Sequence, residues 1–197
     1  MAKIDQYATD FAAIILEEIA AIPSKLAESP HVSIDDGFII MKEFLLLELH
    51  LCDKITFGFL GADVRQQLME RIITQIAVRV DESRKVMLNN MLDTITLDNF
   101  AVYLKRLNMP TGEGLIDDFN RVQVEYSKYK LTKQIEYKSV AGILEWEFGK
   151  KIAFLLRHEN ETSYIEWIAT WAKGLFFKLL VKFKGVVDKY QLGQIVN

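Results

Sequence analysis

Apolar residues recur at the helical period along most of this chain, and this pattern predicts an all-α protein. The longest such stretch runs from Ser33 to Leu60. Ser33 with Asp36 three residues later has the form of a capping box, and Asp36 places a carboxylate in the first turn, where the helix dipole favours negative charge. Gly61 is well placed to end this helix. We therefore expect Ser33 to Leu60 to be the central helix.

Further amphipathic segments lie on both sides of the central helix. The segment after Gly61 should return beside it as a hairpin. No stretch of five or more residues alternates cleanly between polar and apolar side chains with β-branched enrichment, so we expect no sheet. The sequence therefore predicts an irregular bundle of about seven or eight helices. Beside the central helix, the segments expected to be helical are 4–22, 64–76, 86–95, 99–107, 115–126, 140–156 and 163–190.

The domain organisation follows from length and composition. The chain of 197 residues is long enough for one well-buried domain, and nothing in its composition divides it convincingly into two. We expect a single all-helical domain over 1–197, with the turn-rich loop 108–114 as the best candidate for an internal boundary. Residues 1–120 carry 11 basic and 19 acidic side chains, whereas 121–197 carry 13 and 8. The basic part either faces an anionic partner or docks against the acidic part inside the domain.

The composition favours a cytosolic protein. A single cysteine, Cys52, excludes an internal disulfide and indicates a reducing compartment. Cys52 lies on the apolar side of its helix, where a thiol is usually inert and structural. The first residues lack the pattern of a secretory signal, and charged residues interrupt every apolar stretch before the roughly 18 residues that a membrane span needs. We therefore expect no transmembrane segment.

Two glutamates are the most informative polar residues, because each falls within an apolar helix stripe. Glu48 lies in the middle of the stripe of the central helix, and Glu145 has apolar neighbours along one face of its own helix. A carboxylate in such a place must be paired, protonated or bound to something. One interpretation is structural, with Arg71 or Arg79 of the returning helix near Glu48. The other is a ligand or metal site formed by carboxylates from different helices.

His50 and Asp53 are a second candidate pair. They lie one turn apart on the polar side of the central helix, so their side chains can touch, and an aspartate can hold an imidazole in the tautomer that a general base needs. No candidate nucleophile accompanies them. The chain also lacks a glycine-rich phosphate loop, a nucleophile elbow, a zinc-binding histidine pair and the two Glu-x-x-His units of a di-iron centre. These observations favour a protein that is not an enzyme and that holds no metal or cofactor.

The start of the central helix resembles a segment of a known family. Asp36-Gly37-Phe38-Ile39, with Glu43 four residues later, is similar to the Asp-Gly-x-Ile-x-x-x-Glu segment that opens a helix in the tellurite-resistance TerB-like all-helical domains. In that family the acidic residues of the segment are associated with metal binding, so the resemblance implies such a role for Asp36 and Glu43. The match covers eight residues of 197, and helix capping accounts for the same residues equally well.

The last helix carries a second face beside its core-facing stripe. Trp167 and Trp171 share that face with Lys178 and Lys182. Such an aromatic and basic surface can bind a protein partner or a second copy, lie on a membrane interface or stack against nucleic acid. It can also pack on a neighbouring helix, with the lysine stems covering the tryptophans. The isoelectric point near 5.7 argues against strong affinity for nucleic acid.

The sequence therefore predicts a non-enzymatic, cytosolic interaction or regulatory protein that binds a protein partner or associates with itself. Contact with a membrane surface and binding of a small ligand stay open, and nucleic acid is disfavoured. The alternative is a ligand- or metal-binding helical protein, with an enzyme as one form of it, organised around Glu48 and Glu145. The predicted interface residues are Trp167, Trp171, Lys178 and Lys182, and the predicted ligand-binding residues are Glu48, Glu145, His50 and Asp53.

Overall fold

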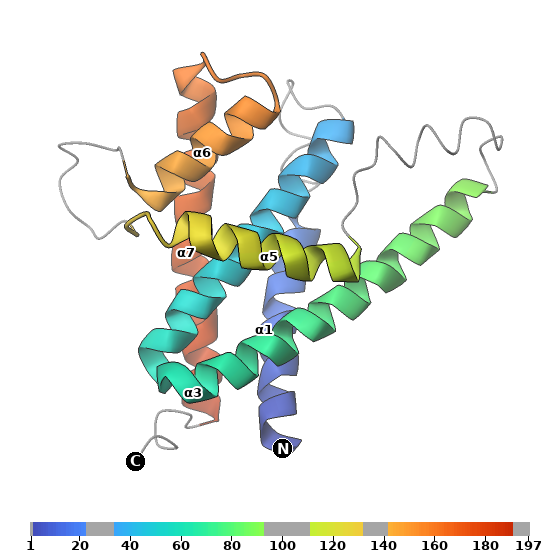
Figure 1. Cartoon of the computed structure of the whole chain (residues 1–197), viewed down its shortest axis with the longest axis vertical. Helices are drawn as coiled ribbons and strands as arrows, with labels where there is room; N and C mark the ends of the chain where they lie inside the picture. The colour runs from blue at the N-terminus through green and yellow to red at the C-terminus, as the bar shows by residue number, and fades with distance from the viewer. Residues whose placement is uncertain (1, 23–33, 93–110, 132–141, 191–197) are drawn as a thin grey trace.

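Five α-helices make up the described part of the chain, which confirms the all-α class. The computed structural model describes residues 2–22, 34–92, 111–131 and 142–190 (Figure 1). Within these ranges there is no strand, and one isolated bridge joins Lys130 to Ile143. None of the described helices is long and apolar enough to cross a membrane. The helices are α1 (Ala2–Ala20), α3 (Ile34–Leu92), α5 (Gly112–Tyr126), α6 (Leu144–Leu155) and α7 (Thr162–Lys189).

The long helix α3 turns back on itself at Gly61. The backbone of Gly61 has φ 74° and ψ 179°, a region that is essentially restricted to glycine. The two arms on either side of it run in opposing directions and diverge from the turn (Figure 1). The predicted reversal at Gly61 is thus confirmed, but the returning arm diverges from the first arm and does not run beside it along its length. The number of seven or eight helices is not supported, because the returning arm continues to Leu92 and absorbs the start of the segment predicted at 86–95; the helix predicted at 99–107 lies outside the described residues.

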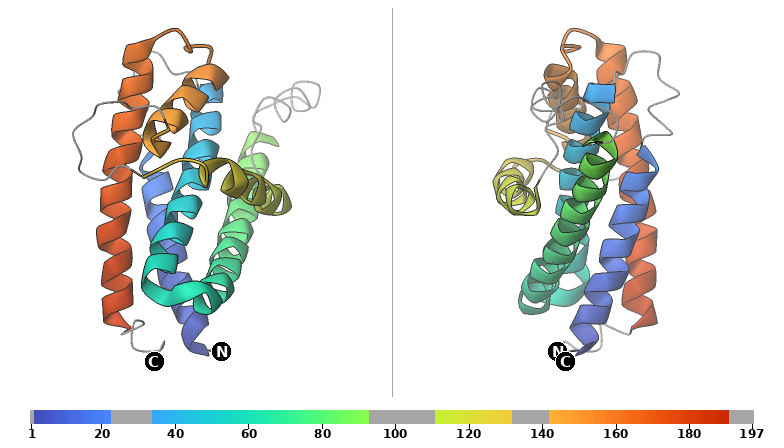
Figure 2. Two further views of the ribbon diagram at one scale, coloured as in Figure 1. Left: turned by 60° about the vertical axis from the view of Figure 1, so that its left-hand side comes forward. Right: turned by 90° about the vertical axis from the view of Figure 1, so that its right-hand side faces the viewer.

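The first arm of α3 is the centre of the fold. The helix α3 contacts α1, α5, α6 and α7. Figure 2 shows why: α5 crosses α3 on one side, while α1 and α7 lie together on the other. Every residue from 43 to 53 is buried, although an amphipathic helix at the surface of a protein normally keeps one side in water. This part of the arm is therefore enclosed on all sides.

Short polar contacts fix where α5 and α6 begin. Thr111 caps α5 by accepting a hydrogen bond from the Gly114 N–H at 2.9 Å, and the Gly112 N–H donates to Asp81 of α3 at 2.8 Å. At the other end, the Leu144 N–H donates to the carbonyl of Lys130 at 2.8 Å. The start of α6 is thereby tied to the chain that leaves α5.

The helices α6 and α7 approach each other closely at Gly149. A Cβ atom added at Gly149 would lie 2.6 Å from the backbone oxygen of Ile165, which is closer than real Cβ contacts. At Gly174, in the middle of α7, an added Cβ would meet nothing within 4 Å. The close contact requires glycine at Gly149 but not at Gly174. Substitution by alanine should therefore affect the two positions differently.

We expect Gly149→Ala to lower the free energy of unfolding by about 1–3 kcal/mol, because the new methyl group overpacks against backbone that cannot yield. Gly174→Ala, the matched control, should raise the free energy of unfolding by about 0.5–1 kcal/mol, because alanine loses less backbone entropy in a helix. Urea unfolding followed by circular dichroism measures both. Equal effects of the two substitutions would contradict the close contact at Gly149.

Candidate functional site

Most of the buried polar residues in the described part of the chain lie on the first arm of α3. Glu43, Glu48, His50 and Asp53 are 7%, 1%, 1% and 4% exposed. The sequence pattern placed His50 and Asp53 on the polar side of this helix, and the expectation that this side faces solvent is wrong. The side that looks polar in the sequence is covered by the neighbouring helices, so its polar groups need partners inside the protein.

His50 and Asp53 each have such a partner, on different elements. The Nδ1 atom of His50 lies 2.9 Å from Oε1 of Gln123 on α5. Since an amide oxygen can only accept, Nδ1 carries the proton of this hydrogen bond. Asp53 binds Arg65 across the Gly61 turn, with Nε 2.5 Å from Oδ1 and Nη2 2.6 Å from Oδ2. This bidentate ion pair joins the two arms of α3.

Burial shifts the protonation of His50 strongly. Removal from water lowers its pKa to about 4; the hydrogen bond to Gln123 and the charge of Asp53 oppose this shift, and the positive charge of Lys54 adds to it. His50 is therefore neutral at neutral pH. Burial likewise raises the pKa of the Cys52 thiol well above its usual value, and the nearby charges of Asp53 and Glu48 act in the same direction.

Glu48 and Glu145 are both buried, as the sequence pattern predicted, with 1% and 5% of their surface exposed. The arginines expected near Glu48 bind other carboxylates: Arg71 pairs with Asp5 of α1, and Arg79 lies 3.1 Å from Glu82. Glu145 lies in the first turn of α6, where the helix dipole favours a carboxylate. Among the described residues, no group of three or more His, Cys, Asp or Glu side chains is arranged to hold a metal ion.

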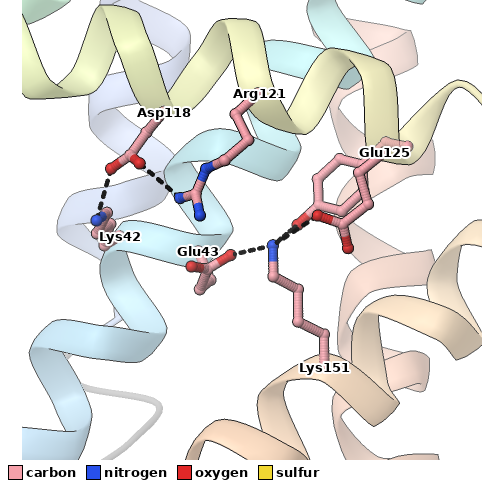
Figure 3. A network of polar contacts seen from close by, with 7 residues as sticks. Lys42, Glu43, Asp118, Arg121, Glu125 and Lys151 are labelled. Carbon is pink, nitrogen blue, oxygen red and sulfur yellow. Dashed lines mark hydrogen bonds and ion pairs between the residues drawn. The ribbon is translucent and has the colours of Figure 1, made fainter.

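A network of charged residues joins α3, α5 and α6 (Figure 3). The ammonium group of Lys151 lies 2.9 Å from Glu43 and 3.5 Å from Glu125. It also donates to the Tyr126 hydroxyl at 3.3 Å and lies 5.0 Å from the centre of that ring. Burial raises the pKa of Tyr126 well above its usual value, and the charges of Glu43 and Glu125 raise it further. One lysine of α6 thus neutralises carboxylates of two other helices.

A second branch of the network lies beside the first. Lys42 of α3 and Arg121 of α5 both lie 2.6 Å from Asp118. Burial alone would raise the pKa of Asp118, but these two cations outweigh it and hold the pKa below its usual value. Nothing in the sequence marked the pairing of Lys42 with Asp118 or of Lys151 with Glu43, because each joins two helices that are far apart in the chain. The pattern of polar residues along α5, taken alone, indicates only a surface in contact with water.

The residues predicted to form an interface on α7 have contacts inside the fold. The Trp171 ring lies 4.4 Å from that of Phe44 on α3, and Trp167 lies 5.8 Å from Trp171. Lys178 and Lys182 both bind Glu18 of α1, each at 2.7 Å. These are the contacts expected if the aromatic and basic face packs on neighbouring helices.

The pairing with two lysines controls the ionisation of Glu18, whose side chain is 1% exposed. Burial alone would raise its pKa, but the hydrogen bonds and charges of Lys178 and Lys182 keep the pKa below the usual value. Lys178 keeps half of its side chain in solvent, whereas Lys182 is more covered. This part of α7 therefore serves first to hold α1.

No family model, curated protein or solved structure matches this chain. The resemblance at Asp36 and Glu43 thus extends no further than its eight residues, and Glu43 is engaged by Lys151 in this structure. The function has to be inferred from the geometry of the molecule itself.

The neutral His50 makes the stability of the fold depend on pH. An unfolded chain binds a proton at His50 below about pH 6.5, whereas the folded chain resists protonation until about pH 4. The contribution of His50 to stability is therefore present above pH 6.5 and is lost as the pH falls through this window, by up to about 1.4 kcal/mol per pH unit. Urea unfolding at several pH values should show this slope in the wild type and a reduced slope in His50→Gln. His158→Gln, at a partly exposed histidine, is the control and should keep the wild-type slope. An unchanged slope in His50→Gln would contradict a buried, neutral His50.

Proposed function

We propose that this protein is a cytosolic, non-enzymatic interaction or regulatory protein that binds a protein partner through the outer face of α7. The observation that carries the proposal is Val181, which is 73% exposed and is the most exposed large apolar side chain in the described part of the chain. It is the twentieth of the 28 residues of α7, a helix about 42 Å long, and lies more than two turns from its end. A strongly exposed apolar side chain within a long outer helix is a suitable anchor for a partner.

The state of the acid–base candidates supports a role without catalysis. His50 is held by Gln123, and Asp53 is held by both prongs of Arg65. A general base must reach the proton that it removes, and these side chains are at most 4% exposed. Their hydrogen bonds instead connect the arms of α3 and attach α5 to them, which is a structural task.

The proposed surface adjoins the interface predicted from the sequence and shares Lys178 with it. Lys182 and Trp171 turn toward α1 and α3, whereas Lys178 retains 51% of its side-chain exposure. A partner would therefore meet Val181 and Lys178, with Trp167 as a half-buried neighbour nearer the start of the helix. This places the contact on the side of α7 that points away from the core.

A photoreactive phenylalanine analogue at position 181 tests this surface in the cells that produce the protein. We expect a covalent adduct at 181 and none at position 124, the matched control, because Val124 on α5 is 67% exposed but lies on another helix. Mass spectrometry of the adduct identifies what was captured. Equal labelling at 181 and 124, or none at either, would contradict a partner-binding surface on α7.

The alternative, a ligand- or metal-binding protein, is supported by the burial of Glu48 and Glu145 on different helices. It predicts that untagged protein purified without chelators contains about one equivalent of a divalent ion. The variant Glu48→Gln should remain folded but lose this ion. The exposed Glu70→Gln is the control and should keep the ion. Elemental analysis that finds the same content in all three proteins would rule the alternative out.

A further inference from the structure

Most of one side of α7 faces solvent. The buried residues of α7 repeat along one stripe, from Ile165 through Leu179 to Val187. At the helical period of 100° per residue, the opposite stripe is centred near Thr170 and Val181. The exposed members of this outer stripe are Ser163, Glu166, Thr170, Gly174, Val181, Lys184, Gly185 and Asp188, whereas Phe177 in the same stripe is half-buried against the core. Figure 2 shows α7 along one side of the molecule.

Nothing in the described part of the chain accounts for the two glycines of the outer stripe. An added Cβ atom at Gly174 or at Gly185 would meet no atom of the described residues within 4 Å, so these residues leave room for a side chain at both positions. Glycine in a helix interior is less stable than alanine. Small residues on either side of the exposed Val181 leave space for another backbone to come close.

The charges of the outer stripe are arranged with opposite signs at its two ends. Glu166 lies near the start of α7 and Lys184 near its end, both are exposed, and both fall on the same edge of the stripe because 18 residues make five turns of helix. Within the described part of the chain neither has an ion-pair partner, whereas Lys178, on the other edge, is already neutralised by Glu18. In two antiparallel copies of α7, the negative end of each stripe would therefore face the positive end of the other.

We infer that the partner of this face is a second copy of this chain, docked with its α7 antiparallel to the first. A twofold axis near residue 175 places Glu166 of each copy at the height of Lys184 of the other, on the same edge of the pair. The same operation brings Thr170 of each copy within one residue of the height of Val181 of the other. Two Val181–Thr170 contacts therefore lie between the two identical ion pairs, with Gly174 of each copy close to the axis. The inference rests on the proposed function, since it names the occupant of the same surface.

Charge reversal at the ends of the stripe tests this arrangement. Glu166→Lys and Lys184→Glu should each raise the dimer dissociation constant about tenfold or more, because each puts two pairs of like charges face to face. The double variant Glu166→Lys with Lys184→Glu restores both ion pairs with reversed polarity, so it should return to within about threefold of the wild type. Sedimentation equilibrium of the full chain over a wide range of concentration measures all four proteins.

The control keeps the charge changes but moves them off the stripe. Glu70→Lys on α3 and Lys128→Glu beyond α5 are exposed and should leave the dissociation constant unchanged. Recovery in the double variant supports the antiparallel pair. The antiparallel pair is overturned if the wild type stays monomeric at every concentration. It is also overturned if the dissociation constant of the double variant is as high as those of the single variants.

The photocrosslink at position 181 separates failure of this inference from failure of the proposed function. An adduct with twice the mass of the chain supports the second copy. An adduct with a different protein overturns the second copy but leaves α7 as the interaction surface. Absence of any adduct at 181, with a monomeric wild type, overturns both.

Discussion

Residues 43–53 of α3 are buried on every side of the helix, and the surrounding helices are placed by this burial. A segment buried in this way cannot give its polar side chains to water, so they need partners inside the protein. Asp53 is matched by Arg65 from the returning arm, His50 by Gln123 from α5, and Glu43 by Lys151 from α6. The returning arm, α5 and α6 are thereby each linked to a particular polar residue of the first arm.

The uneven charge of the chain is resolved by the same means. The acidic N-terminal part and the basic C-terminal part are joined by ion pairs: Glu18 binds two lysines of α7, and Asp10 lies 2.8 Å from Lys189. These contacts are those expected if the basic part docks against the acidic part within the molecule. Because Glu18 is almost fully buried, its pairing matters more to stability than a surface salt bridge would.

Aromatic rings connect the α7 face to the centre of the molecule. Neighbouring ring centres lie 4.4 Å apart from Trp171 to Phe44, 4.9 Å from Phe44 to Phe148 and 6.4 Å from Phe148 to Tyr126. Tyr126 in turn lies 5.4 Å from the ring of His50. Rings in such tilted and edge-on arrangements pack densely and fix one another's rotamers. The tryptophans that looked like an exposed feature in the sequence are therefore the outer end of the core.

Features that depend on neighbours along the chain could be predicted from the sequence. Hydrophobic periodicity gave the helical class and the burial of Glu48, Glu145 and Cys52, and Gly61 marked the reversal because only glycine adopts that backbone conformation without strain. The tertiary structure alone decided that the polar side of the central helix is buried and which charges meet there. Lys151 and Glu43 are more than a hundred positions apart, and periodicity reports only which residues share a face, not whether another helix covers that face.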